Sequence, residues 1–149
     1  MPAGPHERAF ERVYTMTDYY DGPRRGIASF DGRPHAYASV FDHVKDGDAE
    51  IYELRAVDED TFARALEDWA IWLRWDDAFH AGLTTIETHP ALPADRARHD
   101  ALAPVLAASL AALPGPVVQA SGVFRPSAGH THGGGGRWLE VQWSPLGDA

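Results

Sequence analysis

Asp76 and His80 are the residues whose types and spacing best suggest catalytic chemistry. Residues four apart share a face of a helix, and at ~100° per residue both fall within the apolar stripe of the helix we expect over 58–80. A carboxylate that orients an imidazole forms the acid–base pair of a small hydrolase-like enzyme. Because no nucleophile motif accompanies the pair, the favoured alternative is that it only caps the last helical turn.

The segment 18–26 concentrates polar chemistry in one predicted loop. Its functional side chains are Asp18, Tyr19, Tyr20, Asp21, Arg24 and Arg25. Arginine binds carboxylate or phosphate groups through two parallel hydrogen bonds, and tyrosine offers a rigid contact area. The loop is therefore a candidate ligand- or partner-binding site. A structural turn, in which an arginine pairs with a local carboxylate, is an equally good interpretation.

His130 and His132 form a His-x-His pattern that can ligate zinc or another divalent metal. Glycines flank the pattern, and ordering such a chain costs about 1 kcal/mol or more per residue. We therefore predict that no metal and no cofactor is bound here.

Three tryptophans recur at a spacing of three residues, at Trp69, Trp72 and Trp75. The helical wheel places Trp69 and Trp72 in the core stripe and Trp75 outside it, near ~240°. We expect Trp75, together with Trp138 of a later strand, to be exposed and available for contact with a partner.

The composition limits the classes of partner. A formal charge of −9 repels phosphate backbones and anionic lipids, so we expect a protein or a small ligand and neither nucleic acid nor membrane. There is no cysteine, which excludes disulfides and thiolate chemistry. The polar first residues lack the apolar core of a secretory signal, so we expect a cytoplasmic location.

Hydrophobic patterning predicts four strands, two helices and two further strands. Asp31-Gly32 indicates a hairpin turn, Asp58 a helix start and Gly82 a helix end. The strands are expected over 13–17, 27–30, 35–41, 50–57, 117–124 and 137–143. The second helix is expected over 93–113, with a kink or a break near Pro104.

The predicted fold is α+β, with an antiparallel sheet of five to six strands and two helices packed on one face. Residues 1–12 are expected to form a flexible tail and 13–149 a single domain. The favoured function is a small, acidic, non-catalytic binding protein that uses the 18–26 loop and exposed aromatic residues. The alternative enzyme needs Asp76, His80 and an anion-anchoring Arg24 or Arg25 to converge in one pocket. The binding protein needs instead a flat or edge-strand patch with exposed aromatic residues. If a small-molecule site exists, we expect it where the 18–26 loop meets the C-terminal end of the first helix, and a purely structural Arg–Asp–His network there would need the same contact.

Overall fold

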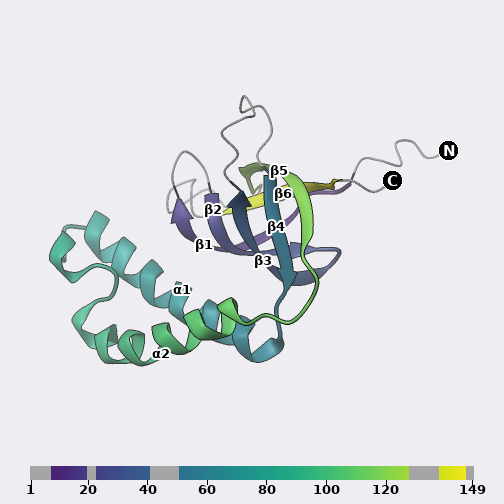
Figure 1. Cartoon of the computed structure of the whole chain (residues 1–149). Helices are drawn as coiled ribbons and strands as arrows, with labels where there is room; N and C mark the ends of the chain where they lie inside the picture. Colours follow the sequence, from purple (N-terminus) through teal and green to yellow (C-terminus); the bar gives the residue numbers. More distant parts are fainter. Residues whose placement is uncertain (1–7, 20–22, 41–50, 128–137, 147–149) are drawn as a thin grey trace. The chain divides into compact units, whose positions relative to one another are not determined.

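The computed structural model describes residues 8–19, 23–40, 51–127 and 138–146, which divide into two compact units (Figure 1). One unit comprises residues 1–57 and 114–149, and the other comprises residues 58–113. The first contains β1 (Glu11–Tyr19), β2 (Pro23–Phe30), β3 (Arg33–Val40), β4 (Ile51–Ala56), β5 (Val118–Pro126) and β6 (Leu139–Pro145). The second contains α1 (Glu59–His80), the short 3-10 helix η1 (Ile86–Thr88) and α2 (Pro93–Ala111).

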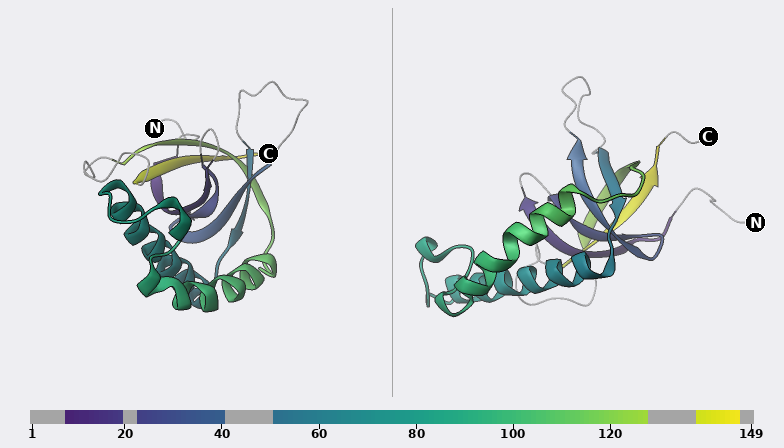
Figure 2. Two further views of the ribbon diagram at one scale, coloured as in Figure 1. Left: turned by 90° about the vertical axis from the view of Figure 1, so that its left-hand side faces the viewer. Right: turned by 60° about the horizontal axis from the view of Figure 1, so that its bottom comes forward.

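The strands form a closed antiparallel barrel in the order β1-β2-β3-β4-β5-β6 (Figure 2). Closure comes from β1 and β6, which pair at Glu11 with Val141 and at Arg12 with Glu140. The predicted order of four strands, two helices and two strands is confirmed. The predicted open sheet with helices packed on one face is wrong, because the sheet closes on itself.

Closure is possible because the barrel supplies its own core. Tyr37, Tyr52, Phe124 and Trp143 contact one another inside it, with ring centroids 5.5–6.0 Å apart. A small barrel has an interior just wide enough to be filled by side chains. This core therefore needs no helix to cover it.

The polar atoms of the core rings are satisfied by backbone carbonyl groups. The hydroxyl of Tyr37 donates to Thr15 O at 3.1 Å, and that of Tyr52 donates to Pro23 O at 2.8 Å. Trp143 Nε1 donates to the carbonyl of Ser29 at 3.0 Å. Burial, with a smaller effect of Tyr52, raises the pKa of Tyr37, so the phenol stays a neutral donor.

Two glycines within strands allow the sheet to curl tightly. A Cβ on Gly26 would lie 2.1 Å from the carbonyl oxygen of Thr15, and one on Gly122 would lie 2.6 Å from the ring of Trp143. The register between β1 and β2 shifts between Val13 and Thr15, and Thr15 Oγ1 accepts a hydrogen bond from Ile27 N. Irregularities and glycines of this kind bend strands at the corners of barrels.

The local signals for turns and helix ends are confirmed. Asp31 and Gly32 have φ values of 57° and 79°, as the tight turn between β2 and β3 requires. Asp58 caps α1 by accepting a hydrogen bond from Thr61 N at 3.0 Å. The helix ends before Gly82, whose φ is 77°.

The helical unit is a hairpin in which α1 and α2 contact each other. Arginine–carboxylate pairs join the two helices, with Arg74 Nε 2.9 Å from Asp95 Oδ2 and Arg98 Nε 2.6 Å from Glu67 Oε2. The second helix includes Pro104 within its bounds, so the predicted break is wrong, while a kink at Pro104 stays a prediction. Within the described part of the chain, neither helix is long and apolar enough to cross a membrane.

Candidate functional site

The end of α1 forms a Schellman motif with an unusual final residue. Gly82 N donates to Phe79 O and Leu83 N donates to Ala78 O, which satisfies the last carbonyl groups of the helix. The residue after the glycine commonly packs an apolar side chain back onto the helix. Here Leu83 has that position, yet it is 79% exposed.

The chain that follows Leu83 is fixed by a network around Thr88. The Thr88 hydroxyl donates to Thr85 O at 2.8 Å and accepts from Trp75 Nε1 at 2.8 Å. Because its proton is used on Thr85, the hydroxyl of Thr84, 2.6 Å away, is the donor between these two threonines. Arg96 donates to Thr88 O at 2.9 Å from α2. Four separate positions thus hold this segment in one conformation.

This fixed segment carries a second exposed apolar side chain. Ile86, the first residue of η1, is 60% exposed, and Phe79 in the last turn of α1 is 37% exposed. We call residues 79–92 the hairpin tip. Large apolar side chains held outward on an ordered backbone form a surface suited to contact with another molecule.

Asp76 and His80 lie together at the end of α1. Nδ1 of His80 is 3.3 Å from Asp76 Oδ1 and 2.9 Å from the carbonyl oxygen of Asp76. The residue Asp76 is 8% exposed, whereas the His80 side chain is 71% exposed. The geometry fits both a cap on the last turn and an oriented acid–base pair, so the catalytic role stays a prediction.

The predicted 18–26 loop is mostly strand. β1 extends to Tyr19 and β2 begins at Pro23, so only residues 20–22, which include Tyr20 and Asp21, lie outside the described residues. Asp18 and Arg25 are exposed and form a backbone pair, while Arg24 is half-buried. The expected contact of Arg24 and Arg25 with Asp76 and His80 joins residues of the two units and stays a prediction.

The expectation that Trp75 is exposed is wrong. It is 4% exposed, because Phe79 stacks on it at 4.9 Å and His89 contacts it edge-on at 4.6 Å. Trp75 is therefore a buried residue that packs against Phe79 and His89 of the hairpin tip. Trp138 is half-buried beside β6.

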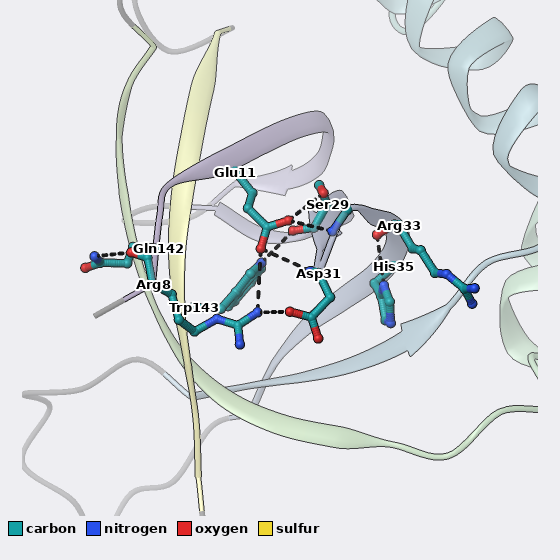
Figure 3. Close-up of polar contacts among 9 residues, drawn as sticks. Arg8, Glu11, Ser29, Asp31, Arg33, His35, Gln142 and Trp143 are labelled. Atoms are coloured by element: carbon teal, nitrogen blue, oxygen red, sulfur yellow. Dashed lines mark hydrogen bonds and ion pairs between the residues drawn. The ribbon is translucent and has the colours of Figure 1, made fainter. Parts of the chain in front are cut away.

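A polar network that the sequence did not indicate surrounds Glu11 (Figure 3). Its carboxylate accepts hydrogen bonds from Ser29 Oγ at 2.6 Å, Gly32 N at 3.0 Å and Asp31 N at 3.1 Å. Arg8 bonds Asp31, and its guanidinium lies over the ring of Phe30 at 4.7 Å. The network holds the start of β1 against the turn between β2 and β3, which is a structural task.

Burial of Glu11 opposes its ionisation, but these hydrogen bonds and the charge of Arg8 outweigh it and lower the pKa of the carboxyl group. Glu11 is therefore ionised at neutral pH and contributes stability there.

His130 and His132 lie outside the described residues. Within residues 8–19, 23–40, 51–127 and 138–146, no three histidine, aspartate or glutamate side chains form a group that could hold a metal ion.

Comparisons of the chain with protein-family models, curated proteins and solved structures found no match.

Proposed function

We propose that this protein is a non-catalytic binding protein, and that the hairpin tip is its main contact surface for a protein partner. The observation that carries the proposal is the exposure of Leu83 and Ile86, at 79% and 60%, on a backbone fixed by the Thr88 network. Scattered apolar residues are ordinary on protein surfaces. Two large ones within four residues of an ordered turn are a preformed anchor for a partner.

The fixed backbone of the tip lowers the cost of binding. Full burial of a leucine or isoleucine side chain contributes about 1.5–3 kcal/mol. Ordering a mobile chain costs roughly 1–2 kcal/mol per residue, so a mobile loop would lose most of this gain to ordering. A tip that is ordered on folding does not bear that cost again on binding, so more of the burial energy is available for affinity.

The barrel unit offers a second contact area under the same proposal. Asp18 and Arg25 are exposed at the ends of β1 and β2, and Trp138 is half-buried next to β6. Exposed charged groups of this kind add specificity to a contact more than affinity.

Selection from a random peptide library tests the proposal, because it requires no particular partner. The library is panned against the wild-type protein, and the selected peptides are measured against Leu83→Gln/Ile86→Gln and against Val105→Gln. Val105, 47% exposed on α2 of the same unit, is the matched control. We expect the double substitution to weaken binding at least about tenfold and the control to leave it unchanged. Peptides that bind all three proteins equally would refute the tip as the contact surface.

A second candidate function is a small hydrolase-like enzyme, which the 3.3 Å contact between Asp76 and His80 favours. In that case Arg24 or Arg25 would anchor an anionic group of the substrate. His80→Ala would abolish turnover of an ester or phosphoester probe and keep the fold. No turnover in the wild-type protein, with only a small fall in stability on His80→Ala, would leave the pair a structural cap.

A further inference from the structure

The formal charge of the helical unit favours a partner of opposite charge. Residues 58–113 contain ten aspartate and glutamate residues and four arginines, a formal charge of −6 within the total of −9. A surface of one sign attracts a partner of the other sign and repels its own kind. The unit that carries the exposed apolar tip is thus also the more acidic of the two.

Three of the four arginines are engaged within the hairpin. Arg74 makes two hydrogen bonds to Asp95, at 2.9 and 3.0 Å, and Arg98 makes two to Glu67, at 2.6 and 2.7 Å. Arg96 donates to backbone carbonyl groups of the tip. These cations connect α1, α2 and the tip, and the charges of Arg74 and Arg98 are paired with carboxylates of the hairpin itself.

An ionised carboxylate lies directly beside one of the apolar anchors in the sequence. Glu87 follows Ile86 directly in η1 and is exposed. A hydrogen bond from Thr85 and the backbone of Glu87 itself lower the pKa of this carboxyl group, so it is ionised at neutral pH. Asp77 is exposed in the last turn of α1, close in sequence to Leu83.

We propose that the hairpin tip binds a cationic amphipathic polypeptide segment, in which lysine or arginine side chains alternate with large apolar ones. The apolar side chains would cover Leu83 and Ile86, and the cations would pair with Glu87 and neighbouring carboxylates. This inference depends on the proposed function and adds the class of partner. A second copy of the hairpin fits less well, because two units that each carry a formal charge of −6 repel each other.

Three synthetic peptides test the class of partner. They share one amphipathic pattern of leucines and differ only in the polar positions, which are all lysine, all glutamine or all glutamate. Binding of each labelled peptide is measured by fluorescence anisotropy at low and at physiological salt. Duplex DNA and anionic lipid vesicles are measured in parallel.

We expect the lysine peptide to bind at least about tenfold more tightly than the glutamine peptide, and the glutamate peptide not to bind. Rising salt should reduce this preference, because the pairs at the rim are exposed. Glu87→Gln should weaken the lysine peptide about two- to fivefold, the effect of losing one exposed ion pair. Leu83→Gln/Ile86→Gln should weaken both the lysine and glutamine peptides, and Val105→Gln neither.

The outcomes separate the two proposals. If lysine and glutamine peptides bind equally and both depend on Leu83 and Ile86, the class of partner is wrong and the contact surface stands. If the lysine peptide binds the Leu83→Gln/Ile86→Gln protein as tightly as the wild type, it adsorbs to acidic surface in general, and both proposals are refuted. Preference for the glutamate peptide, DNA or anionic vesicles would overturn the class of partner directly.

Discussion

Gly26→Ala should destabilise the barrel severely, and the structure shows why. A Cβ at this position would lie 2.1 Å from the carbonyl oxygen of Thr15 and 2.7 Å from the hydroxyl of Tyr37. The first neighbour is backbone and cannot rotate away. β1 would have to move by about 1 Å to restore ordinary van der Waals separation.

The size of the effect follows from what that movement disturbs. Forcing extra atoms into a packed core costs about 1–3 kcal/mol. The shift would also strain two buried hydrogen bonds, from Tyr37 to Thr15 O and from Ile27 N to Thr15 Oγ1. Each buried group left unsatisfied adds about 1–3 kcal/mol. We therefore expect a loss of at least about 3 kcal/mol, the lower end of these terms together, which is a large part of the ~5–15 kcal/mol of a typical domain.

Equilibrium urea unfolding, followed by the near-ultraviolet circular dichroism of the core rings, measures this loss. Gly115→Ala is the matched control, since a Cβ there meets no atom within 4 Å; its effect should stay within about 1 kcal/mol. If Gly26→Ala costs less than about 1 kcal/mol, β1 and β2 do not approach as described. The account of barrel closure would then be wrong.

Three further predictions concern single side chains. Hydrogen bonds to Glu11 lower the pKa of its carboxyl group below the ordinary 4.5. The stability that Glu11 contributes is therefore complete above pH 4.5 and is lost as the pH falls through the lowered pKa. Glu11→Gln should flatten the acid side of the curve of stability against pH, and an unchanged curve would contradict the network. Trp75→Phe removes the hydrogen bond to Thr88, so hydrogen exchange of residues 84–92 should accelerate about tenfold while α2 stays protected; equal protection would show that the bond does not hold the tip. His80→Ala should cost less than about 1 kcal/mol if the contact with Asp76 is only an exposed cap, and thermal unfolding that shows a much larger loss would refute that interpretation.

Local features of the fold could be predicted from the sequence because their causes are local. Asp58 caps α1 through its own side chain, and Asp31-Gly32 adopts the positive φ values that its residue types favour. Closure of the barrel could not be predicted in this way, since Glu11 and Val141 meet from opposite ends of the chain. Gly26 and Gly122 were the available signals, because a glycine inside a strand often marks a bend or close approach.

The candidate site likewise contains one feature that local sequence predicts and others that depend on tertiary contacts. The contact between Asp76 and His80 follows from helical spacing alone. Trp75 lies outside the apolar stripe of its helix, yet it is buried because Phe79, Thr88 and His89 surround it. Leu83 follows a helix-ending glycine, where an apolar residue is expected to pack inward. Only the structure shows that it does not.

Methyl NMR tests the central claim most directly. The protein is labelled at the methyl groups of leucine, isoleucine and valine, and the lysine-leucine peptide is titrated into it. We predict that the signals of Leu83 and Ile86 shift and saturate together, while those of Val105 on α2 and Val123 on the barrel stay in place. Saturable shifts at Val105 or Val123 with Leu83 and Ile86 unmoved would contradict the assignment of the hairpin tip as the contact surface.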